Sequence, residues 1–329
     1  MGQASNVSAK VSIITPLYNR AKLVLDTVDS VRGQSFENWE LLIVDDHSTD
    51  HSLRVVTDYS RPDDRIKVWS RKSTCKGAPS CRNEGLAAAV GEFVLFLDSD
   101  DLLATTCLEN RLSEFDARPH FDAHIFPSEM FRKSPGDLGR KWCVPSQDPL
   151  TDFLEKPLWQ TTAALWKSDS VKRIGGFRED LMAWQDWDLF VRCIVEEFEF
   201  CVHNESQADN YIRRSLHQRI SQTAERNRDS IKNRRVLFRD IYTLLRERKK
   251  LNPHRIKAMR KLFVNLAVKM HLTKMHAEAD RWIAELPSFG LIDETEVESE
   301  QKKARQLSRL NLRQLTNELK LKILQWIRK

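Results

Sequence analysis

Residues 92–101 read EFVLFLDSDD, an apolar run that ends in three carboxylates within four positions. A short continuous apolar run of this kind is typical of a strand that is buried on both faces of a parallel sheet. The segment WELLIVDD (39–46) repeats the pattern and ends in two aspartates. Because ligands in open parallel sheets bind beyond the carboxyl ends of the strands, both acidic ends are predicted to lie where the chemistry takes place.

The rest of residues 11–101 alternates between short β-rich runs and helical patterns. Strands are predicted at VSIIT (11–15), WELLIVDD, RIKVW (65–69) and EFVLFLD (92–98), and helices at about 21–32, after Asp50 and at about 80–90. Four strands joined by three helical crossovers predict a Rossmann-like α/β half with a mostly parallel sheet.

The pattern changes twice along the remaining chain. Residues 121–205 are irregular, with strand-like pieces DAHIF (122–126) and TTAALW (161–166) and the aromatic, acidic segment AWQDWDLF (183–190). From about residue 226 strand patterns disappear, and helices are predicted at about 229–250, 254–272 and 275–286, before an acidic connector (293–300) and a final helix. The predicted organisation is a flexible N-terminus (1–10), an α/β domain (11–225) and a helical region (226–329).

Composition limits the class of protein. With 329 residues and 41% hydrophobic content, the chain can bury a large core. No run approaches the roughly 20 apolar residues that cross a bilayer, and residues 1–10 lack a signal-peptide core, so the cytoplasm is the predicted compartment. The six cysteines contain no CxxC pair, which predicts reduced structural thiols rather than a zinc cluster or a disulfide framework.

Charge is unevenly distributed along the chain. Residues 1–229 carry 29 basic and 36 acidic residues, whereas residues 230–329 carry 24 and 11. Residues 300–329 hold nine basic and two acidic residues and an apolar stripe that predicts a basic amphipathic helix: Leu312, Leu315, Leu319, Ile323 and Trp326. Such a helix can contact an anionic membrane at its inner face, pack against the core or mediate oligomerisation, and the three alternatives stay open.

The tract Asp98–Asp101 places carboxylates so close together that they would repel one another unless a cation or solvent neutralised them. Mg²⁺ and Mn²⁺ prefer carboxylate and phosphate oxygens, and Mg²⁺ binds through one or two carboxylates together with substrate phosphates. A bound divalent cation is therefore one prediction for this tract. The alternative is a solvated loop or the cap of a following helix.

Four segments, in this order and spacing, resemble family 2 glycosyltransferases of the GT-A fold: VSIITPLYN (11–19), LLIVDDHSTD (41–50), GAPSCRNEGLAAAVGEF (77–93) and FLDSDD (96–101). The resemblance covers about residues 11–215. It implies a GT-A domain with a nucleotide-binding half (11–101) and an acceptor half (102–225), followed by an all-helical C-terminal extension.

The resemblance also implies roles for single residues. Tyr18 would stack on the nucleotide base, Asp46 or its neighbour Asp45 would hydrogen-bond the base, and Arg82 would lie near the diphosphate. The first loop would be shaped by Pro16 and Asn19. Each has a structural alternative: Tyr18 could cover the sheet end, Asn19 could cap the next helix, and Arg82 could pair with a surface carboxylate.

In the acidic tract, the resemblance implies that Asp98 faces the ribose or the metal and that Ser99 belongs to the donor site. Asp100 would coordinate the metal that bridges the diphosphate, with Asp101 as a third member. The segment YIRRSLHQRIS (211–221) resembles the Tyr- and Arg-rich ending of the family, which makes His217 a further candidate ligand.

The segment Trp184–Asp188 resembles the family segment that carries the general base of inverting transfer, and Asp186 falls on the base position. A base removes the proton of the acceptor hydroxyl while the diphosphate leaves. Gln185 stands where the family commonly has Glu, so Asp188 is kept as a second candidate base. The alternative is an amphipathic helix that packs its tryptophans and turns its acids to water.

Together these features predict an inverting glycosyltransferase that uses a nucleotide-diphosphate sugar, with UDP-sugar as the expected donor and Mn²⁺ or Mg²⁺ as the cofactor. A lipid-linked or envelope glycan is the expected acceptor. The alternatives are a nucleotidyltransferase, which would need a Gly-rich basic loop that TPLYNR lacks, and a non-catalytic scaffold at a membrane or on nucleic acid. The negatively charged core with its carboxylate motifs argues against the scaffold and against nucleic acid.

Overall fold

The protein was analysed as a computed structural model, which describes residues 9–214 and 227–309. Its internal contacts divide the chain into two compact units. Unit 1 holds residues 1–149, 157–180 and 184–217, and unit 2 holds residues 150–156, 181–183 and 218–329. The two units are described separately.

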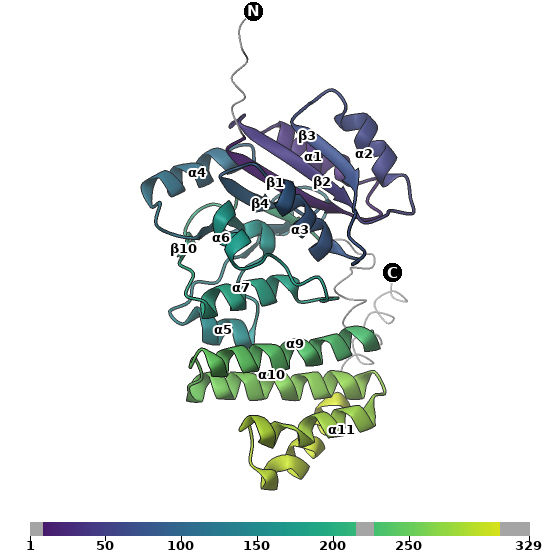
Figure 1. Ribbon diagram of the computed structural model, residues 1–329, viewed down its shortest axis with the longest axis vertical. Coiled ribbons are helices and arrows are strands. Elements are labelled where there is room, and N and C mark those ends of the chain that lie inside the picture. Colours follow the sequence, from purple (N-terminus) through teal and green to yellow (C-terminus); the bar gives the residue numbers. More distant parts are fainter. Residues whose placement is uncertain (1–8, 215–226, 310–329) are drawn as a thin grey trace, which may run out of the picture. The chain divides into compact units, whose positions relative to one another are not determined.

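Within the described residues, unit 1 is built on a seven-stranded sheet with the order β10-β6-β9-β4-β1-β2-β3 (Figure 1). β9 runs antiparallel to both of its neighbours, and the other adjacent pairs are parallel. The strands are β1 (Val11–Leu17), β2 (Trp39–Asp45), β3 (Ile66–Ser70), β4 (Phe93–Phe96), β6 (Ala123–Ile125), β9 (Ala164–Lys167) and β10 (Phe200–Val202).

A smaller sheet has the order β5-β11-β7-β8. Its strands are β5 (Leu102–Leu103), β7 (Ser128–Phe131), β8 (Arg140–Trp142) and β11 (Asn210–Arg213). β5 follows the acidic tract directly, and it pairs with β11, more than 100 positions later, at Tyr211 and Leu102. The acidic tract therefore lies where the two sheets are joined.

Helices cover both faces of the large sheet because successive side chains of β1 point to opposite faces. Val11 and Ile13 belong to one apolar cluster with residues of α1 (Val24–Arg32) and α4 (Cys107–Ala117). Ile14 faces α3 (Ala78–Ala88), which packs over β1 and β2 (Figure 1). A Cβ at Gly85 would lie 2.4 Å from Ile14 Cγ2, so glycine permits the close approach of α3.

The remaining helices of unit 1 complete this layer structure. They are α2 (Ser52–Ser60), the 3₁₀ turn η1 (Thr161–Ala163), α6 (Ser168–Arg173) and α7 (Gln185–Val195). α2 packs against β3, and α6 packs against β9. This arrangement confirms the predicted α/β fold with a mostly parallel central sheet.

Unit 2 is helical, as the sequence predicted, and α9 (Arg228–Glu247) and α10 (Pro253–Leu272) lie side by side (Figure 1). Asparagine caps begin both helices: the Asn227 side chain accepts from two backbone N–H groups, and that of Asn252 accepts from one. The ring of Phe263 in α10 stacks 4.6 Å from Trp282 of α11 (His276–Ala284). Unit 2 also contains α5 (Pro149–Glu155) from its second residue onward, η2 (Leu286–Phe289) and η3 (Glu294–Glu296).

Two local predictions differ from the structure. The first helix begins at Val24 rather than near residue 21. The acidic segment 293–300, predicted as a connector, instead starts the last helix, because Asp293 and Glu296 form a capping box and residues from 297 onward are helical. Among the described residues, no helix combines the length and apolar character needed to span a bilayer.

Candidate active site

Three neighbouring parallel strands of unit 1, β4, β1 and β2, end on the same side of the sheet, called here the carboxyl edge. β1 pairs with β2 as far as Leu17, but its pairing with β4 ends at Ile14, whose carbonyl accepts from Leu97 N–H. The backbone of Pro16 faces the same side of β1 as that of Ile14, towards β4. Because the pairing of β1 with β4 has already ended at Ile14, the lack of an N–H at Pro16 costs no hydrogen bond between these strands. The loops beyond these strands carry the predicted site residues.

The loop after β1 exposes Tyr18 and fixes Asn19. Tyr18 has 42% of its surface exposed, enough for its ring to stack on a planar ligand. Asn19 has a left-handed backbone (φ 51°), and its side-chain oxygen accepts from the backbone N–H groups of Thr49 (2.8 Å) and Asp50 (3.2 Å). Asn19 therefore ties the first loop to the loop after β2 and does not cap α1.

Asp45 and Asp46, at the end of β2, both accept hydrogen bonds from protein groups. The buried Asp45 carboxylate accepts from the backbone N–H and the hydroxyl of Ser48, at 3.0 and 2.5 Å. Asp46 accepts from Arg71 Nε at 2.7 Å and from Gly77 N–H at 2.9 Å. Asp45 thus shapes its own turn, whereas Asp46 links the end of β2 to β3 and to the start of α3.

Arg82 is a buried cation of α3 that reaches two acids from different segments. Its Nη2 donates to Asp98 Oδ1 at 2.6 Å, and its Nη1 lies 3.8 Å from Asp186 Oδ1. The guanidinium lies over the ring of Phe177, 5.0 Å from its centroid. Among the described residues, no hydrogen-bond acceptor engages Nε or Nη1, and buried donors of this kind favour an anionic ligand.

The carboxylates of the tract 98–101 differ in their surroundings. Asp98 has 46% of its side chain exposed and Asp100 26%, and Asp100 Oδ2 lies 3.1 Å from Arg20 Nε. Asp101 is buried, and its Oδ1 accepts from the backbone N–H of Arg213 at 2.8 Å. The accessible carboxylates of the tract are therefore Asp98 and Asp100, while Asp101 holds the tract against β11.

Burial and mutual repulsion act together on this tract. Burial, and next the charge of Asp98, raises the pKa of Asp100 above its ordinary value. Burial, and next the charges of Asp100 and Asp98, raises the pKa of Asp101 well above its ordinary value. Clustered carboxylates that resist ionisation are a donor set that suits Mg²⁺ or Mn²⁺, because both ions take oxygen ligands.

Asp186 lies in the first turn of α7, directly after the left-handed Trp184 (φ 68°) and Gln185. Its side chain is 40% exposed. Desolvation by the surrounding protein raises the pKa of Asp186, and the charge of Arg82 opposes that rise. The result is a solvent-accessible carboxylate with a raised pKa, a property that suits a general base.

Asp188, two residues later, has a different environment. It is fully buried, and its Oδ2 accepts from Arg192 Nε at 2.8 Å. Arg192 in turn donates to the carbonyl oxygens of Ile174 (2.9 Å) and Gly176 (2.7 Å). Asp188 therefore orients an arginine that holds the loop before α7, and Asp186 is the acid of this segment that reaches solvent.

Three arginines of the carboxyl edge had no assigned role in the sequence: Arg20, which pairs with Asp100, Arg71, which pairs with Asp46, and Arg213, whose Nε donates to the Asp100 carbonyl at 2.9 Å. The sequence could have pointed to Arg20 and Arg71 as site residues, because each follows the end of a predicted strand. Ser99 is buried within the tract. His217 lies outside the described residues.

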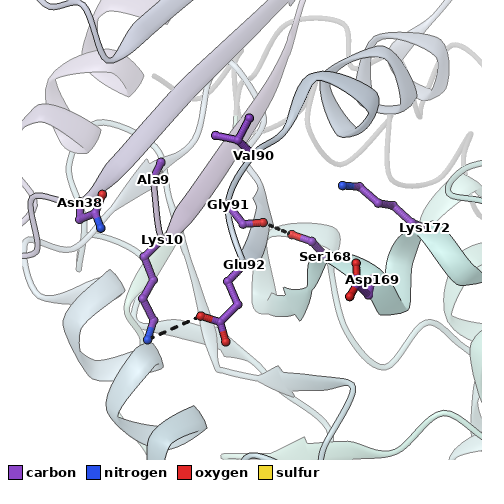
Figure 2. A pocket seen from close by; sticks show the side chains of 9 residues that line it. All are labelled: Ala9, Lys10, Asn38, Val90, Gly91, Glu92, Ser168, Asp169 and Lys172. Carbon is purple, nitrogen blue, oxygen red and sulfur yellow. Dashed lines mark hydrogen bonds and ion pairs between the residues drawn. The ribbon is translucent and has the colours of Figure 1, made fainter. Parts of the chain in front are cut away.

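A hollow of about 460 Å³ lies at the opposite, amino-terminal edge of the sheet (Figure 2). It is lined by residues that precede β1 and β4 and by α6, and Ser168 Oγ donates to the Gly91 carbonyl at 2.5 Å. Lys10 and Glu92 form an ion pair at 3.7 Å beside it. Because ligands of open α/β sheets bind at the carboxyl edge, this hollow is not assigned to the candidate active site.

Solved structures share the fold over most of the chain's length. Residues 1–349 of TarS from S. aureus, crystallised with UDP-GlcNAc, match with a TM-score of 0.60 and 19% identity over 93% of this chain and 92% of that one. The mannosyltransferase PcManGT from Pyrobaculum calidifontis, in complex with GDP-Man and Mn²⁺, matches with a TM-score of 0.54 and 17% identity over 93% and 88%. The fold is therefore of the GT-A type.

Sequence relatives add the family. A β-1,3-glucosyltransferase of Campylobacter jejuni that is named for GalNAc(5)-diNAcBac-PP-undecaprenol is 34% identical over 40% of this chain and 42% of its own length. A putative teichuronic acid biosynthesis glycosyltransferase, TuaG, of Bacillus subtilis is 43% identical over 33% of this chain and 42% of its own length. The chain thus spans less than half the length of each of these two relatives.

Residues 12–145 match the family model described as Glycosyl transferase family 2. The matched range begins in β1 and contains the loops with Tyr18, Asp46 and Arg82 and the tract 98–101. Residues 12–145 therefore match glycosyltransferase family 2, which confirms the resemblance seen in the sequence over this range. Asp186 lies beyond the matched range.

Proposed function

We propose that this protein is an inverting glycosyltransferase that moves a sugar from a nucleotide-diphosphate sugar, with UDP-sugar as the expected donor, to a hydroxyl of a glycan or lipid-linked acceptor. The observation that carries the proposal is the position of Arg82, a buried cation at the carboxyl edge that contacts both Asp98 and Asp186. The guanidinium of Arg82 thereby links Asp98, in the proposed donor site, to Asp186, the proposed base.

The nucleotide half of the proposal rests on residues of three loops. The exposed ring of Tyr18 stacks on the base, and Asp46, anchored by Arg71 and Gly77, hydrogen-bonds it with support from Asp45. The unpaired donors of Arg82 face the diphosphate, and Asp98 contacts the ribose. Pro16 and Ser99 contribute backbone shape to the same edge.

Asp98 and Asp100 are the residues proposed to hold Mn²⁺ or Mg²⁺, because both are accessible and each keeps an oxygen beyond its arginine partner. When bound there, the cation stabilises the charge of the departing diphosphate. Asp101, the third member of the proposed metal site, keeps the tract in place by accepting from the Arg213 backbone N–H. His217, also proposed as a ligand, lies outside the described residues.

Asp186 is proposed to remove the proton of the acceptor hydroxyl as that oxygen attacks the anomeric carbon from the side opposite the leaving group. This geometry inverts the configuration and gives a β-linked product from an α-linked donor. Arg82 limits the rise in the pKa of Asp186 and so favours the ionised carboxylate. Asp188 was the second candidate base. Because it is fully buried against Arg192, we propose that it supports the structure around Asp186 and does not act as the base.

The donor and acceptor classes follow from the relatives. TarS crystallised with UDP-GlcNAc supports a UDP-sugar donor. A relative from Escherichia coli, 42% identical over 31% of this chain and 40% of its own length, is named for UDP-Glc and an α-D-GlcNAc-diphosphoundecaprenol acceptor. A lipid-linked or envelope glycan is accordingly the acceptor class that we propose.

Residues 300–329 are proposed to contact the inner face of the membrane, where such acceptors would be met. The sequence supports this through nine basic residues and an apolar stripe, and the whole stripe lies outside the described residues. Co-sedimentation with vesicles of anionic phospholipid, with and without residues 300–329, tests it. Vesicle binding should require residues 300–329 and should weaken as the salt concentration rises. Equal binding by the chain with and without these residues would contradict the proposed membrane contact.

The activity itself is tested by release of nucleoside diphosphate from a panel of UDP- and GDP-sugars with Mn²⁺, using undecaprenyl-diphosphate-linked saccharides as acceptors. Native protein should release UDP in an acceptor-dependent way, and the product linkage should be β. Asp100→Ala and Asp186→Asn should each lose turnover.

Asp169→Asn is the matched control, since it makes the same substitution in an exposed residue beside the amino-terminal hollow. It should turn over like the native protein. Unchanged turnover in Asp100→Ala and Asp186→Asn, or release of pyrophosphate rather than nucleoside diphosphate, would contradict the proposed function.

A further inference from the structure

A second cluster of ligand-type side chains lies on β6 and β10, away from the carboxyl-edge site. It consists of His124 in β6, Cys201 in β10 and His203 just beyond β10, and the strand register pairs His124 with Cys201. One atom from each of the three side chains lies within 4.8 Å of the others. β9 and β6 separate β10 from β4, so the cluster is distinct from the site of Asp98 and Asp186.

The cluster is buried and its rings are held in place. His124 is fully buried, and Cys201 and His203 are each 8% exposed. The ring of Phe115 lies 4.1 Å from that of His124, and Phe126 stacks on His203 at 4.5 Å with an interplanar angle of 7°. Buried polar side chains that are fixed in this way need defined partners.

The hydrogen-bond partners of the two histidines fix the tautomers of their neutral rings. His124 Nε2 lies 3.1 Å from the Arg118 carbonyl oxygen, which can only accept, so Nε2 carries the proton. His124 Nδ1 is then an acceptor, and His203 Nε2, 2.9 Å away, must donate to it. His203 Nδ1 is left as an acceptor that faces Glu114 Oε2 at 3.9 Å, another acceptor.

With neutral imidazoles, one nitrogen lone pair of His203 faces the Glu114 carboxylate. A cation placed between the rings would take the lone pairs of His124 Nδ1 and His203 Nε2 and leave the proton of His203 on Nδ1, where it can donate towards Glu114.

We propose that His124, Cys201 and His203 hold a zinc ion, with water as the fourth ligand. Neutral imidazole and thiolate are the ligands that zinc prefers. In this arrangement His124 donates its second N–H to a backbone carbonyl, and His203 Nδ1 lies 3.9 Å from a Glu114 carboxylate oxygen; carbonyls and carboxylates are the usual groups behind metal-bound histidines. Binding releases the thiol proton of Cys201 to solvent.

The distances and charges suit this ion. Zinc–nitrogen bonds of about 2.0–2.1 Å at the tetrahedral angle separate two nitrogens by about 3.4 Å, so the ring nitrogens must part by about half an ångström from their present 2.9 Å. The charge of the ion is balanced by the Cys201 thiolate and by Glu114, which also pairs with Arg118. The sulfur of Cys201 belongs to the same group of ligand atoms, which lie within 4.8 Å of one another.

The proposed ion would fasten the outer edge of the sheet. β10 is an edge strand held by three register pairs to β6, and Glu114 belongs to α4. A zinc site would tie these three elements together and protect a short edge strand. This role is independent of sugar transfer.

The test uses the full chain, stripped with a chelator and reloaded with Zn²⁺ or Co²⁺. Bound Co²⁺ should give visible d–d bands of tetrahedral intensity and a near-ultraviolet sulfur-to-metal band, and Zn²⁺ should abolish both. Cobalt bound by the tract 98–101 has oxygen ligands and gives no sulfur band, so the spectrum separates the two sites. Zn²⁺ should also raise Tm by several degrees.

Matched variants complete the test. Cys201→Ser should lose the sulfur band and His203→Gln should lose tight zinc binding, whereas Cys75→Ser and His120→Gln, both exposed in the native chain, should keep one zinc ion. Should a variant fail to fold, the native protein still decides the matter. The absence of a sulfur-to-cobalt band from the native chain, or its survival in Cys201→Ser, would overturn the zinc site.

Discussion

Asp186 and Asp188 lie two residues apart in one helix and meet opposite surroundings. Asp186 is 40% exposed and faces Arg82, whereas Asp188 is completely buried against Arg192. The tract 98–101 repeats the contrast, since Asp98 is accessible and Asp101 is buried. An acidic motif thus combines one carboxylate placed for chemistry with another that holds the first in position, and burial distinguishes them.

The largest effect is expected for Asp186→Asn, because it removes the proposed base and keeps the shape of the side chain. Turnover should fall about a thousandfold, within the range for loss of a general base. The thermal midpoint should barely change, since the side chain is partly exposed. Initial rates of nucleoside diphosphate release and a melting curve, measured on one preparation, test both statements, and retention of native turnover would exclude Asp186 as the base.

Asp100→Ala should reduce turnover about a hundredfold, as expected when one group that stabilises the leaving charge is lost. The Mn²⁺ concentration for half-maximal activity should rise. Because Asp100 and Asp101 oppose each other's ionisation, the variant should be no less stable than the native protein. A variant that needs no more manganese than the native protein would remove Asp100 from the metal site.

Asp188→Asn is expected to lower the stability and to keep the turnover, the reverse of Asp186→Asn. Loss of a buried, charge-assisted hydrogen bond to Arg192 should cost about 2 kcal/mol of the free energy of unfolding. Turnover per folded molecule should stay close to the native value. Chemical denaturation gives the stability, active-site-normalised rates give the turnover, and a stable but inactive variant would restore Asp188 as a candidate base.

The smallest effect concerns the pH dependence of kcat/KM. Asp186 acts as a base only when ionised, so kcat/KM should fall as the pH drops through its pKa, which burial raises. The positive charge of Arg82 lowers that pKa, and Arg82→Gln should therefore move the acid limb to higher pH. An acid limb that stays in place, or moves to lower pH, would show that Arg82 does not act on the base.

The sequence predicted the parts of this fold that depend on local pattern. Apolar runs placed β1, β2, β3 and β4, and the acids after them identified the carboxyl edge. Helical periodicity likewise located α9 and α10. Periodicity did not predict the small sheet, because its short strands pair with partners far away in the chain, such as β5 with β11.

Local pattern could not separate the accessible acids from the buried ones. The burial of Asp101 depends on the backbone of Arg213, 112 residues away, and the setting of Asp186 depends on Arg82. The cluster of His124, Cys201 and His203 could not be predicted for the same reason. His124 lies in β6, far in sequence from Cys201 and His203 at the end of β10, and the three residues form no CxxC spacing. Tertiary pairing, rather than sequence order, creates these sites.

The central claim is that the accessible carboxylates of the carboxyl edge form one metal and nucleotide site. Crystals grown with UDP and Mn²⁺, measured at a wavelength where manganese scatters anomalously, test it directly. We predict a manganese peak within bonding distance of Asp98 or Asp100, with the UDP diphosphate beside Arg82 and the uracil ring against Tyr18. A nucleotide in the amino-terminal hollow of Figure 2, or manganese bound away from both aspartates, would contradict it.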